Sequence, residues 1–552
     1  MRDTSTLNEC SPLILNNQRI GIDLDNTIVC YEKAFAAAAS QLNLFSYTWS
    51  GEKNDLKKAL LSRPEGQRLW QTVQGRVYGT GITDAELFPG VERFLRRCSY
   101  LGKEVFIVSH KTEFGHFDSS GVSLRESALS WLKDKQFFGP TLGLDRGHVF
   151  FADTRSAKVA KIAELKLDIF IDDLQEVLEE PRFPEIKKIL FGNSKNSFTG
   201  GTICGSWHEI EEKVLGSAQI KEIALWFSDV CGIDVSQVNP VHGGGNNRVF
   251  RVVTQQKDEY ALKLYPDLSI DPRPRLHAEL LACSLTKNLD VTPVMCAHDS
   301  CFNLAVFDWI DGTTPSVNHE SIQQAVEFAT RLKEMHLSGD GLSPLASEAC
   351  LSIREVLDQI DKRISALKNN PHPALKRALE GTISPLRRRL EDWVGDQWPL
   401  DRQTVEVPLS NQTLSPSDFG FHNAVEKSDG TLCFIDLEYF GRDDPVKLIA
   451  DFLWHPGMEL SDRQKIFWLD KIFQVFGEDI ELKERFFTSW PVFGLRWALI
   501  LLNEFREDGW KKRLDASHRN SAKLEDRKEE QLAKALGICE MIKQHDFQCP
   551  YV

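Results

Sequence analysis

Short apolar runs alternate with helical patterns through residues 18–215. The runs lack a strict alternation of polar and apolar positions, which is typical of strands that are buried on both faces. Helical patterns such as residues 156–166 separate some of the runs, and this rhythm predicts a doubly wound parallel sheet of the α/β class. The runs are RIGIDLDNTIV from Arg19, EVFIVSHK from Glu104, HVFFADT from His148, LDIFIDDL from Leu167 and KKILFGN from Lys187.

A long interval separates the first two apolar runs. Residues 31–100 contain helical patterns and few strand signals, so we expect a helical insertion after the first strand. Residues 191–206, FGNSKNSFTGGTICGS, predict a loop because Gly, Ser, Thr and Asn dominate them. A first domain is therefore expected over residues 18–215, after a tail at 1–17 and before a linker or leading helix at 216–237.

The pattern changes in the second part of the chain. The strand-like runs NRVFRVVT and EYALKLY come first, and helical patterns follow to the end. Strands followed by helices predict an α+β domain. The charged stretch from Arg513 to Lys534 predicts a solvated helix with charge pairs of mixed sign.

Composition narrows the class of protein. At 552 residues the chain exceeds the ~250–300 residues at which one hydrophobic core stops growing. A net charge of -14 argues against nucleic acid as a partner, because phosphate backbones require a basic face. We find no signal peptide and no apolar run of the ~18 residues that span a bilayer.

The cysteines indicate the compartment. The chain has 12 cysteines without a CxxC pair or a disulfide or zinc spacing, so buried free thiols and a reducing cytoplasm are expected. We therefore expect a cytoplasmic protein that does not insert into membranes. The sequence leaves its oligomeric state open.

Two aspartates lie within the first quoted run, directly after its apolar residues 20–22. Asp23 and Asp25 lie at the expected carboxyl end of a strand, where parallel sheets bind ligands. Side chains at positions i and i+2 of an extended chain point the same way. One carboxylate can attack phosphorus while the other donates a proton to the leaving group and later activates water.

Further polar groups follow the later runs. Ser109 follows VFIV, Lys158 opens the helix after FADT, and Asp172 and Asp173 end LDIFI. Each can reach a phosphate or a Mg²⁺ ion, which prefers carboxylate ligands. Three other assignments stay open: Lys161 is an alternative to Lys158, and His110 and Lys111 face the site or serve the fold alone.

These motifs, in this order, resemble those of the haloacid dehalogenase (HAD) superfamily over Gln18–Leu215. The resemblance implies that Asp23 is the nucleophile that forms an aspartyl-phosphate and that Asp25 is the acid/base. It implies that Ser109 binds the phosphoryl group and that Lys158 offsets its charge. The implied Mg²⁺ ligands are Asp23, the Asp25 carbonyl, Asp172 and Asp173.

The helical insertion at residues 31–100 also matches this resemblance. It is similar to the cap of the superfamily, which shields the site from water and selects substrates. The resemblance thus implies a Mg²⁺-dependent phosphatase in the first domain.

A second set of candidate residues begins with a glycine-rich turn before NRVFRVV. Such a turn lets backbone N–H groups approach nucleotide phosphates, although a plain hairpin is equally compatible. Lys263 lies inside an apolar strand and needs a partner, which phosphates can provide. Glu279 either pairs with Lys263 or is exposed, and backbone groups near Asp308 and Ile310 can bind adenine. The glycines are Gly243, Gly244 and Gly245.

The most informative segment is SPSDFGFHN, followed by FIDLE. Asp418 and Asn423 are five residues apart on an expected loop, and Asp436 ends an apolar strand. Together they supply a base for a substrate hydroxyl, an amide ligand for Mg²⁺ and a carboxylate that bridges metal and ATP.

The segment from about Val238 to Leu536 resembles the aminoglycoside phosphotransferase/choline kinase family. The resemblance implies a bilobal protein-kinase-like fold, with an N-lobe at 238–310 and a helical C-lobe at 311–552. Lys263 would hold the α/β-phosphates, oriented by Glu279. The implied catalytic residues are Asp418 as base and Asn423 and Asp436 as Mg²⁺ ligands.

Two residues around the implied base add detail. The family commonly has a His-Gly pair before its catalytic aspartate, and this chain has Pro416-Ser417 instead. This departure weakens the match but removes no chemical group. Asp451 matches a family aspartate that braces the catalytic loop.

The leading hypothesis is a bifunctional enzyme that uses ATP and Mg²⁺. One domain phosphorylates a hydroxyl of a small molecule, expected to be a sugar or phosphosugar, and the other hydrolyses a phosphomonoester. Two alternatives stay open. Either one domain is active while the other binds a regulatory ligand, or the protein is a nucleotide-binding sensor or scaffold without turnover.

Overall fold

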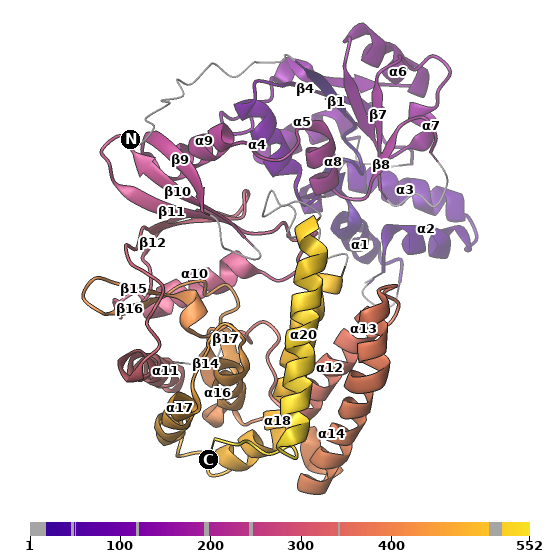
Figure 1. Cartoon of the computed structure of the whole chain (residues 1–552). Helices are drawn as coiled ribbons and strands as arrows, with labels where there is room; N and C mark the ends of the chain where they lie inside the picture. Colours follow the sequence, from indigo (N-terminus) through magenta and orange to yellow (C-terminus); the bar gives the residue numbers. More distant parts are fainter. Residues whose placement is uncertain are drawn as a thin grey trace. The chain divides into compact units, whose positions relative to one another are not determined.

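A computed structural model of the chain shows two compact units. The division lies between Trp226 and Phe227, inside the stretch 216–237 that was expected to link the domains. Figure 1 colours the first unit from indigo to magenta and the second from magenta to yellow. The structure describes residues 18–45, 49, 51–117, 121–192, 198–241, 247–339, 343–506 and 522–551.

The first unit is built on a parallel sheet, as its apolar runs predict. Among the described residues, six strands pair in parallel in the order β5-β4-β1-β6-β7-β8. Figure 1 labels β1, β4, β7 and β8 of this sheet. Because β1 lies between β4 and β6, the carboxyl ends of these three strands are neighbours. The strands are β1 (Arg19–Ile22), β4 (Glu104–His110), β5 (Val149–Ala152), β6 (Ile169–Asp172), β7 (Lys187–Phe191) and β8 (Thr202–Cys204).

Both faces of this sheet are buried, which explains the continuous apolar runs. In β4, Val105 and Ile107 join one core cluster, while Phe106 and Val108 join a second cluster on the opposite face. Successive side chains of a strand point to opposite faces, so a strand covered on both sides must be apolar throughout.

Strand β8 is a correction to the expected loop. Thr202–Cys204 pairs in parallel with β7 at the edge of the sheet. A strand of only three residues between Gly201 and Gly205 gives no recognisable pattern in the sequence. Residues 193–197 of the expected loop lie outside the described part of the chain.

The helical insertion is present, but it ends earlier than expected. Helix α4 packs on α8 and β4 of the sheet layer, with the rings of Phe94 and Trp207 5.1 Å apart. It is therefore the crossover helix that leads into β4, because its apolar face covers the sheet. The segments of the insertion are β2 (Val29–Cys30), α1 (Glu32–Gln41), α2 (Lys53–Leu61), α3 (Gly66–Tyr78), η1 (Thr80–Asp84) and β3 (Glu86–Leu87).

The remaining helices of the first unit surround the sheet. Helix α9 (Ile220–Cys231) spans the division between the two units. The others are α4 (Val91–Tyr100), α5 (Leu124–Asp134), η2 (Arg146–His148), α6 (Arg155–Glu164), α7 (Gln175–Leu178) and α8 (Trp207–Val214).

A buried ion-pair group ties α4 to the two last helices of this unit. Arg97 donates to Glu211 at 2.8 Å and to both carboxylate oxygens of Glu222 at 2.9 and 3.1 Å. The Arg97 side chain is 1% exposed. Breaking such a group leaves a carboxylate buried without its partner, which is costly.

We therefore expect Arg97→Met to lower the free energy of unfolding of the first unit by about 3–5 kcal/mol. Hydrogen exchange of the β1 and β4 amides, followed by mass spectrometry, measures this loss. The exposed Arg182 supplies the control, and Arg182→Met should change exchange by less than about 0.5 kcal/mol. Equal protection in both variants would contradict a structural role of the group.

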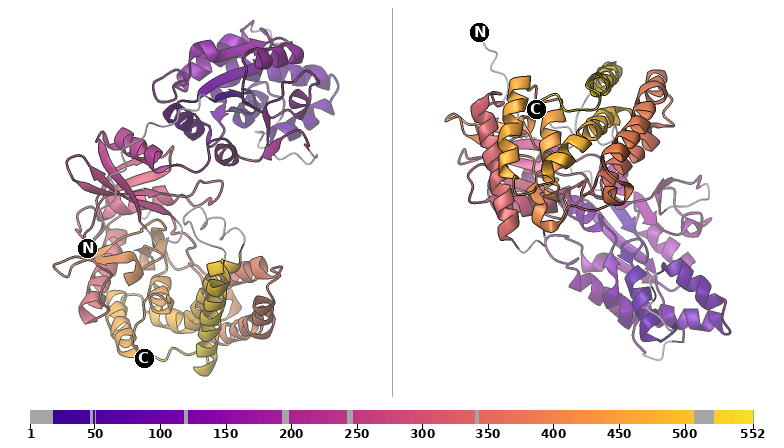
Figure 2. Two further views of the ribbon diagram at one scale, coloured as in Figure 1. Left: turned by 45° about the horizontal axis from the view of Figure 1, so that its top comes forward. Right: turned by 90° about the horizontal axis from the view of Figure 1, so that it is seen from below.

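The second unit begins with an antiparallel sheet. Five strands of the described residues pair in the order β12-β13-β11-β10-β9, drawn in pink in Figure 2. Strand β9 begins at Val235, inside the stretch that was expected to be a linker. The elements are β9 (Val235–Val241), β10 (Arg248–Thr254), β11 (Glu259–Leu264), α10 (Arg275–Thr286), β12 (Met295–Asp299) and β13 (Leu304–Asp308).

The rest of this unit is mainly helical, with two short antiparallel pairs, β14-β17 and β15-β16. One large apolar core holds it together, including the stacked rings of Phe452 and Trp468, 3.8 Å apart. The helices are α11 (His319–Ser338), α12 (Ile353–Leu367), α13 (Pro373–Ala378), η3 (Leu379–Ile383), α14 (Ser384–Gln397), α15 (Leu400–Gln403), η4 (Leu409–Asn411), η5 (Phe421–Asn423), α16 (Pro445–Trp454), α17 (Asp462–Val475), α18 (Leu482–Leu501), η6 (Leu502–Phe505) and α20 (Ala522–Gln544). The strands are β14 (Thr413–Ser415), β15 (Ala424–Glu426), β16 (Leu432–Phe434) and β17 (Gly441–Asp443).

Two sequence expectations concern these helices. In α20, Lys528 pairs with Glu525 at 2.9 Å and Lys534 with Glu530 at 2.6 Å, as the mixed charges predict. Residues 507–521 of the charged stretch lie outside the described residues. Within the described ranges, every helix is too short or too polar to cross a membrane.

Candidate active sites

Three neighbouring strands place the first group of candidate residues. Asp23 follows β1, and its backbone N–H donates to the Ile171 carbonyl of β6 at 2.9 Å. Asp172 is the last residue of β6, and Ser109 lies near the end of β4. The strand order thus brings together residues that are far apart in the sequence, such as Asp23 and Asp172.

Lys158 joins two of these aspartates. Its Nζ donates to Asp23 Oδ1 at 2.5 Å and to Asp172 Oδ2 at 2.7 Å. The Lys158 side chain is 2% exposed. Lys161, the alternative in the sequence, instead pairs with Glu164 at 2.7 Å near the protein surface. The structure therefore places Lys158 and not Lys161 in the site.

The carboxylates outnumber the lysine that neutralises them. One oxygen each of Asp23, Asp172 and Asp173 lie within 4.8 Å of one another. Burial raises the pKa of Asp23 well above its usual range, and Asp172 and Asp173 add to this while Lys158 opposes it. Burial and the charge of Asp172 raise the pKa of Asp173 to about 7. A set of hard oxygen donors with surplus negative charge fits a Mg²⁺ ion.

Asp25 has separate partners. It accepts a hydrogen bond from the Tyr31 hydroxyl at 2.5 Å and pairs with Lys111 Nζ at 2.9 Å. Lys111 is buried and, like His110, lines the cavity beside these aspartates. His110 is exposed, and its ring nitrogen lies 3.1 Å from the Asp153 carbonyl oxygen. Lys111 is thus the nearer of the two residues whose roles the sequence left open.

A cavity of about 420 Å³ opens above these groups. Helix α3 of the insertion contributes Gln74 and Tyr78 to its lining, and β4 contributes Ser109. The Ser109 hydroxyl is buried and has no hydrogen-bond partner among the described residues. A buried polar group without a partner is costly, and a phosphoryl oxygen would satisfy it.

The second group of candidate residues is centred on a buried lysine. Lys263 Nζ of β11 donates to Glu279 Oε2 of α10 at 2.6 Å and forms an ion pair with Asp436. The hydroxyl of Tyr265 donates to the same oxygen of Glu279 at 2.5 Å. Glu279 is 3% exposed, so it is buried beside the lysine and not on the exposed face of its helix.

Sequence reasoning missed three members of this group. Glu438 accepts from Arg275 at 2.7 Å and from the Asn247 amide at 2.6 Å, and it lies 3.5 Å from Lys263. Burial, followed by the charge of Asp436, raises the pKa of Glu438 to about 7. Spacing in the sequence could have indicated two of these residues. Arg275 precedes Glu279 by one helical turn, and Glu438 follows Asp436 by two residues.

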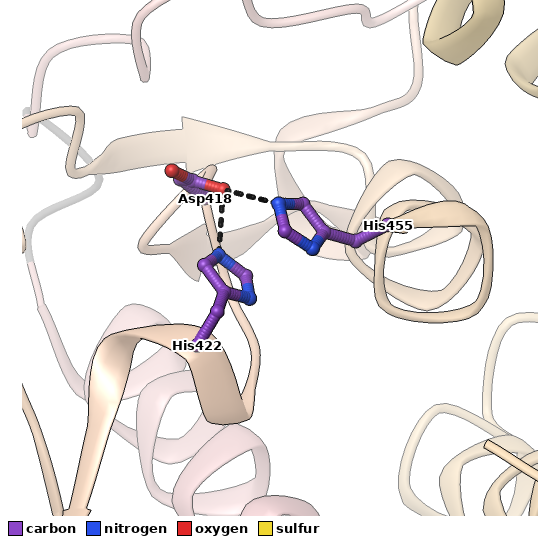
Figure 3. A group of neighbouring side chains, drawn as sticks. All are labelled: Asp418, His422 and His455. Atoms are coloured by element: carbon purple, nitrogen blue, oxygen red, sulfur yellow. Dashed lines mark hydrogen bonds and ion pairs between the residues drawn. The ribbon is translucent and has the colours of Figure 1, made fainter. Parts of the chain in front are cut away.

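Asp418 lies on the loop after β14 and is held by two histidines. His422 Nε2 lies 3.0 Å from Asp418 Oδ1, and His455 Nε2 lies 3.9 Å from the same oxygen. Figure 3 shows both rings on this oxygen, with the second oxygen of Asp418 pointing away from them. The two rings stack with their centroids 3.6 Å apart.

The environment keeps the Asp418 carboxylate ionised. Burial by itself raises its pKa, but the hydrogen bond from His422 and the proximity of both histidine rings lower it to about 2. Burial, together with His422, lowers the pKa of His455 to about 3. At neutral pH the site therefore holds an anionic carboxylate with one oxygen directed away from the two histidines.

The loop around Asp418 is braced from both sides. The Asn423 amide nitrogen donates to the Asp418 carbonyl at 3.0 Å, which directs its own carbonyl oxygen elsewhere. Ser417 has a φ of 67°, and its hydroxyl accepts from Lys447 Nζ at 2.9 Å. Lys447 pairs with Asp451 at 3.2 Å, so Asp451 contacts the loop through Lys447.

The residues expected to bind adenine and phosphate are placed only in part. Asp308 ends β13, and its N–H donates to the Val294 carbonyl at 3.0 Å. Its carboxylate accepts from Cys296 at 3.0 Å, so the side chain takes no part in the Lys263 group. Ile310 follows β13 and is half-buried. Gly243, Gly244 and Gly245 lie outside the described residues.

Comparisons with known proteins give one family match and several similar solved structures. No curated protein is significantly similar to the chain. Among solved structures, choline kinase LicA from Streptococcus pneumoniae is 17% identical, with 58% of this chain and 98% of that chain covered and a TM-score of 0.39. Spectinomycin phosphotransferase APH(9)-Ia, in complex with ADP and spectinomycin, is 12% identical, with the same coverage and a TM-score of 0.39.

A third structure gives similar values. A thermostable mutant of aminoglycoside phosphotransferase APH(4)-Ia is 13% identical, with 58% and 99% of the two chains covered and a TM-score of 0.40. Residues 237–479 match the model of the phosphotransferase enzyme family (APH). This range contains Lys263, Glu279, Asp418, Asn423 and Asp436. Residues 237–479 of the chain are therefore similar to the phosphotransferase enzyme family.

Proposed function

We propose that the second unit transfers the γ-phosphate of ATP to a hydroxyl of a small molecule. The observation that carries this proposal is the ionised Asp418, whose second carboxylate oxygen points away from the histidines that hold the first. A carboxylate with one oxygen fixed and the other available is suited to accept a hydroxyl proton. The proposed domain has an N-lobe at 238–310 and a C-lobe at 311–552.

Each residue then has a defined task. Asp418 accepts the proton of the acceptor hydroxyl as its oxygen attacks the γ-phosphorus, and ADP leaves. Lys263, held by Glu279, binds the α/β-phosphates. Asn423, through its carbonyl oxygen, and Asp436 would hold Mg²⁺, which neutralises phosphate charge when bound. Adenine binding is proposed at the backbone near Asp308 and Ile310, and phosphate binding at the glycines 243–245.

The test is ³¹P NMR of the full-length chain with ATP, Mg²⁺ and a small-molecule extract. The proposal predicts a new phosphomonoester signal that appears as ADP accumulates. ATP binding without any consumption of ATP would instead support the sensor or scaffold hypothesis.

We further propose that residues 18–215 form a HAD-like phosphatase. The supporting observation is the buried Lys158 that joins Asp23 to Asp172 beneath a cavity. Strand-end aspartates alone are common, but a buried lysine between two of them beside an unpartnered serine hydroxyl fits a phosphoryl group. The helical insertion, through α3, is the proposed cap.

The proposed reaction has two steps. A carboxylate oxygen of Asp23 attacks phosphorus while Asp25 protonates the leaving alcohol, which gives an aspartyl-phosphate. Asp25 then takes a proton from water, the water attacks phosphorus, and Asp23 and inorganic phosphate are released. Ser109 and Lys158 bind the phosphoryl oxygens. Mg²⁺, which would further offset their charge, fits Asp23, the Asp25 carbonyl, Asp172 and Asp173.

Lys158→Met should lower phosphatase kcat by about 10²–10³-fold, because it removes a fixed positive charge from the transferring phosphoryl group. Hydrolysis of p-nitrophenyl phosphate by the full-length chain measures this effect. The matched control is Lys161→Met on the same helix, which should retain full activity. A larger loss in the control than in Lys158→Met would contradict the assignment.

A further inference from the structure

The Asp418 carboxylate opens into a cavity of about 480 Å³ within the second unit. This volume is typical of small-molecule sites. Asp418 and Ser417 line one part of it, and Trp497 and Tyr439 contribute aromatic side chains. An acceptor whose hydroxyl reaches Asp418 must therefore occupy this cavity.

Arginines dominate the charged lining of this cavity. They come from segments far apart in the sequence: the stretch before and at the start of α10, helix α12, helix α18 and the end of η6. The five lining arginines are Arg273, Arg275, Arg363, Arg496 and Arg506.

The carboxylates that line the cavity are mostly neutralised by these arginines. Asp271 forms ion pairs with Arg273 and Arg275. Asp451 pairs with Arg496 at 3.4 Å, besides Lys447. They are therefore poor binding groups for a cationic acceptor, which needs uncompensated carboxylates or open aromatic faces.

Positive charge accumulates around one carboxylate, Glu348. Arg363 forms an ion pair with Glu348, and Arg496 lies 3.2 Å from the same oxygen. Burial alone would raise the pKa of Glu348, but Arg363, Arg496 and Arg273 lower it. Burial also lowers the pKa of Arg363, and the charges of Arg496 and Arg506 add to this while Glu348 opposes it.

Arg363 retains donors for a ligand. Its hydrogen bonds within the described residues go to Glu348 and, at 3.4 Å, to Asn503. A guanidinium has five N–H donors in a planar fork, which suits two oxygens of one phosphate or carboxylate. The Arg363 side chain is 12% exposed, so a bound anion would be largely shielded from water and salt.

We propose that the acceptor is an anionic hydroxy compound, phosphorylated or carboxylated, whose charged group binds Arg363 while its hydroxyl reaches Asp418. This inference rests on the proposed kinase activity. It adds to that proposal the chemical class of the acceptor. This acceptor would be negatively charged, whereas choline is positively charged.

The first test fractionates a small-molecule extract of the source cells on an anion-exchange resin at neutral pH. The full-length chain carrying Asp23→Asn, which keeps the first unit from removing phosphate, is incubated with each fraction and γ-labelled ATP. We expect labelled product only from retained, anionic fractions. Pretreatment of the fraction with a phosphatase should abolish labelling if the acceptor is a phosphate ester and leave it intact if the acceptor is a carboxylate.

The possible outcomes separate the two proposals. Labelled product from the unretained, neutral or cationic fraction would overturn the anionic acceptor while leaving the kinase proposal intact. Absence of labelled product from every fraction, including the unfractionated extract, would overturn both proposals.

The second test changes Arg363 and uses the labelled fraction as acceptor. Arg363→Gln should raise KM for the acceptor about ten- to a hundredfold, a larger factor than any accompanying fall in kcat. Arg363→Lys, which keeps the charge without the fork, should have an intermediate KM. Glu348 keeps Arg496 as a partner in both variants, which limits the effect on folding.

The matched control is Arg331→Gln, which should keep the wild-type KM. Arg331 lies on the exposed face of α11, where its side chain is 63% exposed. A wild-type KM in Arg363→Gln, with an unchanged thermal midpoint, would overturn the role of Arg363. If Arg363→Gln fails to fold, Arg363→Lys and the charge of the labelled fraction decide the question.

Discussion

Replacing Asp418 with asparagine is expected to lower kcat for ATP-dependent phosphorylation by about 10²–10⁴-fold, the usual contribution of a general base. Asparagine keeps the shape of the side chain, and its carbonyl oxygen still accepts the hydrogen bond from His422. It cannot accept the proton of the acceptor hydroxyl. The affinity for ATP should change little, because Lys263 and Glu279 are untouched. Initial rates of ADP formation with saturating acceptor measure the effect.

Asp462→Asn is the matched control for this variant. Asp462 is 78% exposed at the start of α17, so its substitution should leave kcat unchanged. An Asp418→Asn variant with at least a tenth of the wild-type kcat would contradict the role of Asp418 as base. The first unit should keep its full phosphatase activity in both variants.

Asp23→Asn is expected to reduce phosphatase kcat by on the order of 10⁴–10⁶-fold, as removal of a catalytic nucleophile does in other enzymes. An amide cannot form the aspartyl-phosphate, whereas a carboxylate can. The variant should fold, because Lys158 keeps its 2.7 Å contact with Asp172. Release of inorganic phosphate from p-nitrophenyl phosphate provides the rate, and trapping of labelled phosphate on the protein reports the intermediate.

The control is Asp134→Asn at the exposed end of α5, which should behave as wild type. Covalent labelling of Asp23→Asn equal to that of wild type would show that another residue is the nucleophile. If Asp23→Asn hydrolyses p-nitrophenyl phosphate at the wild-type rate, and neither Asp23→Asn nor wild type becomes labelled, direct attack of water on phosphorus would be favoured.

The sequence predicted the sheet of the first unit because strands buried on both faces are apolar throughout. It also placed Asp23, Ser109 and Asp172 near one another, since the carboxyl ends of neighbouring parallel strands share an edge. It could not choose between Lys158 and Lys161, which lie three residues apart on one helix. That choice depends on which face of α6 packs on β4 and β5, and only the packing decides it.

In the second site, too, the sequence indicates some residues and gives no indication of others. Lys263 is recognisable because a lysine within an apolar strand is locally unusual. Asp418 is recognisable because it precedes Asn423 by five residues and Asp436 by a further apolar strand. His455 lies at the end of α16 and reaches Asp418 only through the packing of that helix, so no local pattern indicates it. The arginines around Glu348 were also missed, because they come from separate helices and none belongs to a motif.

Two independent phosphate-transfer sites in one chain are the central proposal, and one ³¹P NMR experiment tests it most directly. Wild type, Asp23→Asn and Asp418→Asn are each followed with ATP, Mg²⁺, the acceptor fraction and p-nitrophenyl phosphate in one tube. We expect Asp23→Asn to lose hydrolysis of p-nitrophenyl phosphate and keep phosphorylation of the acceptor, and Asp418→Asn to do the reverse. Loss of both activities in either folded variant would contradict two independent sites.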